Sequence, residues 1–218
     1  MKIKNVIFDL DGTLLNTGSG ITESVEYAVR TLGLRELSRS ELLAFIGPPL
    51  TKSFADICGC SKEEAARATT VFREFYSRGA VFHAEHYEGM PKLCESLCAS
   101  GMKLGIATNK PQRFAVPLTE KFGLDKYLTA VFGANDEGTP TKTELIKLCM
   151  EKLGGSPADT VMVGDTINDA VGAEGAGVRF IAVTYGYGFR RPEDTADCPC
   201  AGMADAPAQI YDIIRNIR

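Results

Sequence analysis

The sequence predicts an α/β fold in which a doubly wound parallel sheet carries an inserted all-helical domain. Three observations indicate this fold. An apolar segment near the N-terminus runs directly into Asp9. Between Ile21 and about Ala80, apolar residues recur at intervals of three and four, as in amphipathic helices. After Pro91, strand-like and helix-like segments alternate, which is typical of parallel strands covered by helices on both faces.

The local spacing of apolar residues predicts the first strand and the helical stretch. Lys2–Phe8 alternates and then becomes apolar and β-branched, as a buried strand requires. Helical spacing follows in ITESVEYAVRTLGL, from Ile21, and in KEEAARATTVFREFYSRGAV, from Lys62. Ser61 is a candidate N-cap for the second helix, with Glu64 at the capping-box position.

The remaining elements alternate along the chain. The predicted strands are Met102–Thr108, Leu128–Ala134, Thr160–Asp165 and VRFIAVTYG from Val178. The predicted helices are Pro111–Phe122, with Pro111 at the first helical position, Lys142–Leu153 before two glycines, Ile167–Glu174 and about Ala206–Ile217. The segment Arg190–Ala206 shows no regular pattern.

The length of 218 residues favours one domain with an insertion, or two small domains. Because no strand pattern interrupts the helical stretch, we expect that stretch to be the insertion. The predicted division is a core domain of residues 1–15 and 87–218 and a helical domain of residues 16–86.

Composition and charge exclude several classes of protein. Hydrophobic residues make up 44% and charged residues 24%, as in ordinary globular domains. The formal net charge of −4 provides no basic surface for nucleic acid, and no apolar run is long enough to span a membrane. The N-terminus lacks the apolar region and cleavage site of a signal peptide. We therefore expect a cytoplasmic monomer or homodimer that binds neither nucleic acid nor membrane.

The cysteines do not form a recognisable framework. There are seven of them at irregular spacing, which argues against a set of disulfides. Two Cys-x-Cys pairs, Cys58/Cys60 and Cys198/Cys200, offer thiolates for zinc, but only two histidines occur and no Cys-x2-Cys spacing is present. Free thiols in a reducing compartment are the favoured interpretation.

Polar residues stand where the predicted strands end. Asp9 and Asp11 follow the first strand, Thr108 and Asn109 end the second, and Asp165 ends a later one, with Asp169 four residues on. In an open parallel sheet these carboxyl ends lie along one edge, where ligands bind. Two carboxylates about 4 Å apart repel by about 4 kcal/mol at an effective dielectric near 20. A hard divalent cation, Mg²⁺, removes this cost and commonly shares carboxylates with substrate phosphate oxygens.

This chemistry assigns roles to the first carboxylates. Asp9 is a candidate nucleophile that forms an aspartyl phosphate. Asp11 is placed to protonate the leaving alcohol and then to activate water. Gly12 permits the tight turn that folds Asp11 back over the strand end. The alternative is a purely structural role in which Asp11 and Gly12 form only a turn, since Asp-Gly is a common turn dipeptide.

The motifs DLDGTLLN, ATNK, a downstream lysine and VGDTINDA, in that order, resemble the four signatures of the haloacid dehalogenase-like hydrolase superfamily. The helical stretch resembles the cap of its phosphoglycolate phosphatase-like branch, and the core would be Rossmann-like. The resemblance implies a Mg²⁺-dependent phosphatase in which Asp9 is the nucleophile and Asp11 the acid/base, whose backbone carbonyl also binds the metal. It further implies that Thr108 and Asn109 contact phosphate, that Asp165 is a metal ligand, and that Asp169 holds either the water shell of the metal or the motif lysine.

Other parts of the resemblance are less specific. Lys142 opens a predicted helix and is our choice for the third-motif lysine, with Lys110 of ATNK as its competitor. Asn16 replaces an acid often found in close relatives. In the helical domain, the Gly-Pro-Pro turn suggests Gly47, Pro48 and Lys52 as contributors to substrate selection, although such a turn also simply breaks helices. TYGYG at Thr184–Gly188 has no assigned role.

The expected substrate is a small phosphorylated metabolite. Phosphoglycolate, a nucleoside monophosphate and pyrophosphate all fit a site built around phosphate. The alternatives are a phosphomutase of the same superfamily, a dehalogenase, which needs no Mg²⁺, and a non-catalytic phosphate-binding module, in which Asp9 or Asp11 would be absent. Dinucleotide binding is rejected because GAEGAG, Gly172–Gly177, does not open a helix after a strand.

Overall fold

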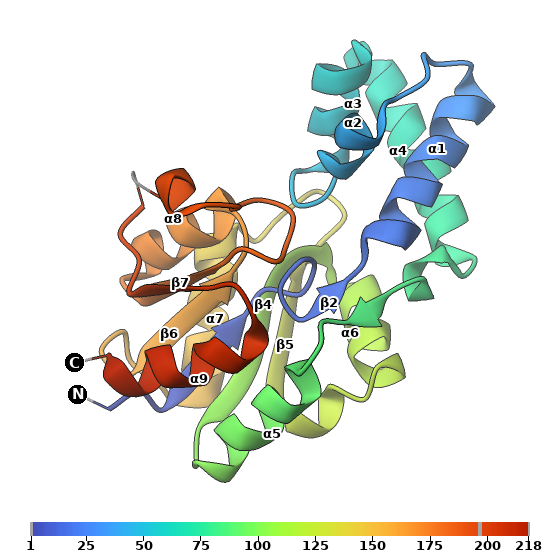
Figure 1. Cartoon of the computed structure of the whole chain (residues 1–218). Helices are drawn as coiled ribbons and strands as arrows, with labels where there is room; N and C mark the ends of the chain where they lie inside the picture. Colours follow the sequence, from blue (N-terminus) through green and yellow to red (C-terminus); the bar gives the residue numbers. More distant parts are fainter. Residues whose placement is uncertain (1, 196–197, 218) are drawn as a thin grey trace. The chain divides into compact units, whose positions relative to one another are not determined.

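The computed structural model describes residues 2–195 and 198–217. The chain divides into two compact units, which are described one at a time. The α/β unit consists of Met1–Asn16 and His86–Arg218, and the helical unit of Thr17–Glu85. Figure 1 shows the elements of both units in sequence colours.

A six-stranded sheet forms the centre of the α/β unit, in the order β5-β4-β1-β6-β7-β8. All of its strand pairs are parallel, and the central strand β1 places Phe8 opposite Ile106 of β4 and Val163 of β6. The strands are β1 (Asn5–Phe8), β4 (Lys103–Pro111), β5 (Leu128–Ala134), β6 (Thr160–Gly164), β7 (Arg179–Val183) and β8 (Gly202–Ala204). Along the sequence, β4 and β5 are added on one side of β1, and β6, β7 and β8 are then added on the other side. The predicted doubly wound fold is therefore confirmed.

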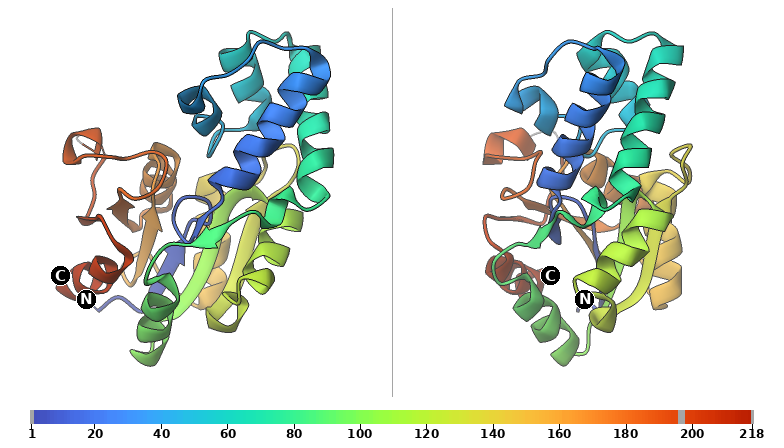
Figure 2. Two further views of the ribbon diagram at one scale, coloured as in Figure 1. Left: turned by 45° about the vertical axis from the view of Figure 1, so that its right-hand side comes forward. Right: turned by 90° about the vertical axis from the view of Figure 1, so that its right-hand side faces the viewer.

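Helices cover both faces of this sheet. As Figures 1 and 2 show, α7 and α8 lie on one face, and α5 and α9 lie on the other. The helices of this unit are α5 (Met90–Ala99), α6 (Gln112–Lys121), α7 (Lys142–Leu153), α8 (Ile167–Ala176) and α9 (Pro207–Asn216), with short 3₁₀ turns η2 (Asp125–Tyr127) and η3 (Pro192–Thr195). This arrangement buries the central strands on both faces, which explains why β1 and β6 read as continuous apolar runs.

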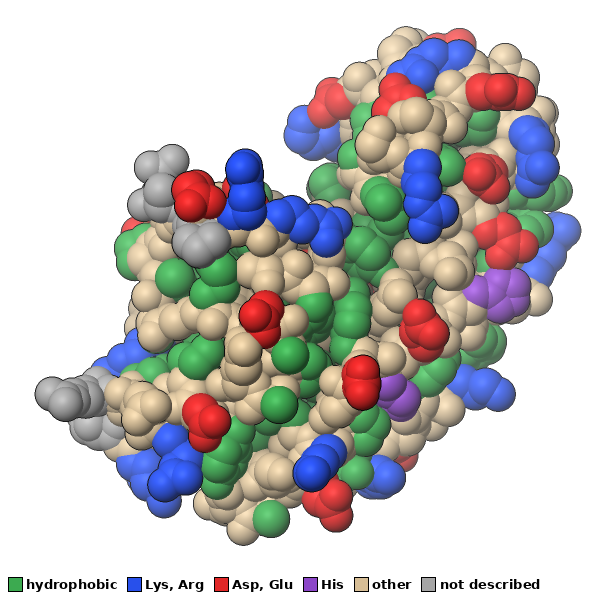
Figure 3. Space-filling view, viewed as in Figure 1, with side chains coloured by type: hydrophobic (Ala, Val, Ile, Leu, Met, Phe, Trp, Pro, Cys, Tyr) green, Lys and Arg blue, Asp and Glu red, His purple; other side chains and the backbone are tan. Residues whose placement is uncertain are grey.

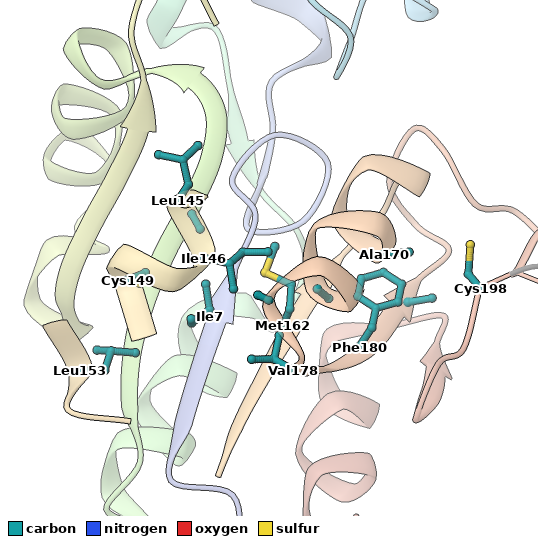
Figure 4. Close-up of a cluster of buried hydrophobic side chains, with 14 of the residues drawn as sticks. Ile7, Leu145, Ile146, Cys149, Leu153, Met162, Ala170, Val178, Phe180 and Cys198 are labelled. Atoms are coloured by element: carbon teal, nitrogen blue, oxygen red, sulfur yellow. The ribbon is translucent and has the colours of Figure 1, made fainter. Parts of the chain in front are cut away.

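A cluster of buried side chains fixes α7 and α8 to the sheet (Figure 4). Ile7 of β1 and Met162 of β6 are fully buried, as are Ile146, Cys149 and Leu153 of α7. Fully burying an aliphatic side chain of this size contributes roughly 1.5–3 kcal/mol. Because Lys142 is the first residue of α7, this packing also fixes the base of its side chain.

The boundaries of α7 agree with the prediction, because both ends carry strong local signals. The Thr141 hydroxyl accepts from the Glu144 backbone N–H at 3.4 Å, and the Glu144 carboxylate accepts from the Thr141 N–H at 2.7 Å. Gly154 ends the helix with φ of 70°. Ser61 and Glu64 form the predicted capping box at the start of α4.

Several predictions of where elements lie are wrong. Strand β1 begins at Asn5 rather than Lys2. Helix α6 begins at Gln112, because β4 continues through Pro111, which is the N-cap rather than the first helical residue. The segment predicted to lack pattern, Arg190–Ala206, contributes strand β8 at the sheet edge, where three residues suffice for pairing with β7.

The helical unit contains α1 (Gly18–Leu32), α2 (Arg39–Leu43), α3 (Leu50–Cys58), α4 (Lys62–Ser77) and the 3₁₀ turn η1 (Ala80–Phe82). Aromatic side chains are prominent in its packing: the rings of Tyr27 and Phe75 stack with centroids 4.3 Å apart. Two short strands, β2 (Leu15–Asn16) and β3 (Glu85–His86), pair where the chain leaves and re-enters the α/β unit.

Within the described ranges, no helix is both long enough and apolar enough to cross a membrane. On the face shown in Figure 3, lysine and arginine side chains are interspersed with aspartate and glutamate. The seven cysteines are free thiols.

Candidate active site

The strands deliver their polar residues to one edge of the sheet. Asp9 follows β1, and its backbone N–H donates to the Val163 carbonyl of β6 at 2.9 Å. Asp165 directly follows β6, and Asp169 lies in the first turn of α8. One carboxylate oxygen from each of these three aspartates lies within 4.8 Å of the others, and all three side chains are buried. The structure thus brings the first and last sequence motifs together.

Lys142 joins two of these aspartates. Its Nζ lies 2.5 Å from Asp9 Oδ1 and 2.6 Å from Asp169 Oδ1. The other Asp169 oxygen accepts from the backbone N–H of Thr166 at 2.9 Å and from its hydroxyl at 2.8 Å. Asp169 therefore both caps α8 and holds the lysine, whereas Lys142 contacts Asp9 through one carboxylate oxygen, Oδ1.

Asp165 is held by a different set of groups. The Thr13 hydroxyl donates to its Oδ1 at 3.3 Å, and the backbone N–H of Tyr187 donates to its Oδ2 at 2.7 Å. Gly12 (φ 85°) and Gly186 pack against this carboxylate so closely that an added Cβ would lie 2.2 and 2.4 Å from Oδ2. Such contacts leave no room for a side chain, so both glycines are required by the position of Asp165.

The aspartates carry more negative charge than the surroundings neutralise. Burial raises the pKa of Asp9 from its ordinary 3.8 to about 7; Lys142 acts against this rise, while Asp169 and Asp11 reinforce it. Burial, followed by the charges of Asp169 and Asp9, also raises the pKa of Asp165. Burial alone would lower the pKa of Lys142, but the charges of Asp169 and Asp9 outweigh it and raise that pKa.

The cluster fits an oxygen-liganded divalent cation. With the three carboxylates ionised and Lys142 protonated, two negative charges remain without a counter-charge. The available ligand atoms are hard carboxylate oxygens, and the described part of the chain places no histidine or cysteine in this group. Asp9, Asp165 and Asp169 each offer one such carboxylate oxygen.

Asp11 lies outside the cluster of three and has its own partner. Lys110 Nζ donates to both Asp11 oxygens, at 3.0 and 3.1 Å. The Lys110 side chain is 4% exposed and that of Asp11 is 13% exposed, so this is a buried ion pair. The structure therefore contains two buried lysines, one on each of the first two aspartates. The metal ligand role that the resemblance gives to the Asp11 backbone stays a prediction.

The phosphate-binding candidates of the second motif lie in an irregular part of β4. Thr108 pairs with Gly133 of β5 and Pro111 pairs with Ala134, so Asn109 and Lys110 occupy a bulge. Thr108 is buried, and its hydroxyl accepts from the Lys110 N–H at 3.2 Å. Bulges commonly re-aim side chains beside active sites. Here the bulge belongs to the segment predicted to contact phosphate.

The two candidates from the helical unit are described within that unit alone. Gly47 has φ of 105° and lies between α2 and α3. Lys52 lies on α3, and its exposed side chain is paired with that of Asp56 at 2.5 Å. Their predicted contribution to substrate selection stays a prediction.

Two groups that contact the aspartates lie outside the predicted site. Lys110 was set aside as a competitor of Lys142, but it pairs with Asp11. TYGYG was left without a role, but its Tyr187 N–H supports Asp165, and the Tyr187 hydroxyl donates to Asn16 Oδ1 at 2.6 Å. The glycines of TYGYG are the signal that was available, because two glycines beside a strand end indicate a close backbone approach.

Comparison with known proteins identifies relatives of the whole chain. A sequence model of the haloacid dehalogenase-like hydrolase family matches residues 6–183. A 5'-nucleotidase from Pseudomonas aeruginosa is 36% identical, over 86% of this chain and 86% of its own. The pyrophosphatase PpaX of Halalkalibacterium halodurans is 32% identical over 85% of each chain. A phosphoglycolate phosphatase from Vibrio parahaemolyticus is 28% identical over 97% of this chain and 96% of its own.

The fold is shared with solved structures. The crystal structure of a predicted phosphatase from Clostridium acetobutylicum superimposes with a TM-score of 0.90 and 31% sequence identity, covering 99% of both chains. The similarity therefore extends over both units and is not limited to the sheet.

Proposed function

Because this chain belongs to the haloacid dehalogenase-like hydrolase family, we propose that it is a magnesium-dependent phosphatase that acts on a small phosphomonoester through a phospho-Asp9 intermediate. The family resemblance predicted from the four motifs is confirmed, as is the prediction of a phosphoric monoester hydrolase. The metal, the intermediate and the substrate are the proposed parts.

The observation that carries this proposal is the charge of the buried group. Asp9, Asp165 and Asp169 lie together around a single lysine, which leaves a surplus of two negative charges. Such a surplus is costly in a buried site unless a cation compensates it. Mg²⁺ matches the surplus charge and the oxygen ligands, and when bound it would shield the nucleophile from the phosphate and polarise a phosphoryl oxygen.

The residues of the chain supply the remaining steps. Asp9, ionised and oriented by Lys142, attacks phosphorus through the oxygen that Lys142 does not contact. Asp11 gives its proton to the leaving oxygen as the ester bond breaks. It then takes a proton from a water molecule that attacks the phosphorus of phospho-Asp9. This second attack releases inorganic phosphate and restores both carboxyl groups.

Positioning is divided among the neighbouring groups. Thr108 and Asn109 are proposed to bind phosphoryl oxygens, and Lys142 to fix Asp9 while balancing part of its charge. The helical domain, predicted as residues 16–86, is proposed to act as a cap that excludes bulk water during transfer, with Gly47 and Lys52 contributing to substrate selection. The family resemblance supports these roles.

The substrate is proposed to be a small soluble metabolite, in keeping with the expected cytoplasmic location. Relatives named 5'-nucleotidase, pyrophosphatase and phosphoglycolate phosphatase define three classes of candidate: nucleoside monophosphates, pyrophosphate and phosphoglycolate. All three present a terminal phosphoryl group to the same carboxylates and differ in the group that leaves.

A phosphate-release screen tests the proposal. The wild-type protein is assayed on small phosphate esters with Mg²⁺ and with EDTA, beside Asp9→Asn and the exposed control Asp212→Asn. We expect release that needs the metal, a loss of roughly 10⁴-fold or more in Asp9→Asn, and no loss in the control. Substantial hydrolysis by Asp9→Asn, or full activity in EDTA, would refute it. Transfer to a sugar phosphate acceptor instead of water would reassign the protein as a phosphomutase.

A further inference from the structure

The buried ion pair between Lys110 and Asp11 has no role in the steps above. Both Asp11 oxygens accept from Lys110 Nζ, and the lysine side chain is 4% exposed. Because an ammonium group loses its hydration on burial, a lysine at such a position needs a compensating partner. Asp11 provides that partner in the free protein.

The position of Lys110 is set by the backbone. Asn109 and Lys110 fill the bulge between Thr108 and Pro111 of β4, opposite a single step of β5. The Lys110 carbonyl packs so closely on Gly133 of β5 that an added Cβ there would lie 2.6 Å away. The Lys110 N–H donates to the Thr108 hydroxyl. These contacts fix the start of the side chain at the edge of the sheet that carries Asp9 and Asp11.

The two buried lysines contact different carboxylates of the proposed reaction. Lys142 contacts Asp9 and Asp169, and thus lies with the nucleophile and the acidic cluster. Lys110 contacts Asp11, the residue that exchanges a proton with the leaving oxygen in the proposed function. A cation within 3.1 Å of the acid/base oxygens is therefore fixed close to the place where the leaving group departs.

We propose that Lys110 is a specificity-determining residue that favours substrates whose leaving group carries its own negative charge. This inference rests on the proposed function, since it requires the leaving oxygen to lie at Asp11. A carboxylate or a second phosphate attached near the leaving oxygen reaches Lys110 and adds an attraction that a neutral alcohol lacks. Phosphoglycolate and pyrophosphate belong to this class, whereas a nucleoside monophosphate releases a neutral nucleoside.

A pair of matched substrates tests this selection. Phosphoglycolate and 2-hydroxyethyl phosphate differ by a carboxylate in place of a hydroxymethyl group, and pyrophosphate adds a phosphate leaving group. We expect the wild-type protein to prefer at least one of the two anionic substrates by about tenfold or more in kcat/KM, and Lys110→Met to reduce that preference by about tenfold or more. The larger of the two preferences then shows whether Lys110 favours a carboxylate or a phosphate on the leaving group.

Two variants control for charge and for surface effects. Lys110→Arg keeps the charge and should retain most of the preference. Lys92→Met removes an exposed lysine of α5 and should change nothing. Equal loss of kcat/KM on all substrates in Lys110→Met would overturn the proposal, because a lysine that only holds Asp11 in place affects every leaving group alike. Failure of the wild-type protein to release phosphate from any substrate would instead refute the proposed function.

Inhibition of the wild-type protein provides a second measurement that does not depend on a folded variant. Glycolate and ethylene glycol are tested as inhibitors of 2-hydroxyethyl phosphate hydrolysis, with inorganic phosphate as a reference. Stronger inhibition by glycolate, by about tenfold or more, is expected from a cation that is fixed beside the leaving-group position. Equal inhibition by glycolate and ethylene glycol, together with no preference between substrates, would overturn the proposal.

Discussion

The two units of the molecule differ in whether they bury charged side chains. In the α/β unit, Asp9, Lys110, Lys142, Asp165 and Asp169 are all buried. In the helical unit, the ion pairs that the structure describes lie at the surface: the side chains of Arg35–Glu41, Lys52–Asp56 and His83–Glu23 are between 34% and 67% exposed. Burying an ion costs several kcal/mol unless it is well paired, whereas exposing it costs little. Buried charged side chains therefore distinguish the α/β unit, which carries the candidate active site, from the helical unit.

The polar groups buried in the helical unit support this contrast. The Ser24 hydroxyl donates to the Gly20 carbonyl at 2.7 Å, and the Thr69 hydroxyl donates to the Ala65 carbonyl at 2.8 Å. Each donates to a carbonyl of its own helix. The α/β unit instead brings together carboxylates from distant parts of the sequence, which repel one another.

The largest expected effect is a difference in the free energy of unfolding between two variants, each of which lacks one lysine of one unit. Lys142→Met leaves buried Asp9 and Asp169 without their cation, so in EDTA we expect a loss of roughly 3 kcal/mol in the free energy of unfolding. Lys52→Met removes an exposed pair with Asp56 and should cost less than about 1 kcal/mol. Urea unfolding measures both. Similar losses in the two variants would show that burial of charge does not distinguish the units.

A smaller effect on the free energy of unfolding is expected when pH is changed in the absence of metal. Because the pKa of Asp9 is raised to about 7, the folded protein keeps a proton that the unfolded chain releases above about pH 4. The contribution of Asp9 to stability is therefore present at low pH and is lost as pH rises toward 7. Carboxyl groups with a lowered pKa, such as Glu41 and Glu64 of the helical unit, act in the opposite direction. Their effect is complete by about pH 5–6.

Unfolding in EDTA at pH 5.5, 6 and 7 isolates this contribution. The wild-type protein should lose stability over this range, and Asp9→Asn should lose less, with the remaining loss coming from the raised pKa of Asp165. Saturating Mg²⁺ should remove the loss, because the cation favours the ionised carboxylate. A wild-type stability that rises from pH 5.5 to 7 in EDTA would contradict the raised pKa.

Much of the fold follows from local signals in the sequence. The ends of α7 were predicted because Thr141, Glu144 and Gly154 are strong capping residues. Strand β8 could not be predicted because its three residues, Gly202–Ala204, carry no periodicity, and their pairing with β7 is a tertiary event. Pro111 was misplaced because its preference for the start of a helix does not reveal how far β4 extends.

The clustering of the aspartates could be predicted from the sequence, but the backbone features around them could not. Asp9, Asp165 and Asp169 could be grouped because strand ends of a parallel sheet share one edge. The pairing of Lys110 with Asp11 depends on a bulge in β4, which the sequence does not reveal. The support of Asp165 by the Tyr187 N–H could not be predicted from side-chain chemistry, because every residue other than proline has that donor.

The central claim is that carboxylates from the first and last motifs bind one divalent cation. Calorimetric titration of Mg²⁺ into the wild-type protein, Asp165→Asn and the exposed control Asp212→Asn tests it most directly. We expect one ion per chain for the wild-type protein and the control, and an affinity weaker by roughly 100-fold or more for Asp165→Asn. Equal affinity in the wild-type protein and Asp165→Asn would contradict the claim, because the cation would then be bound without the buried cluster.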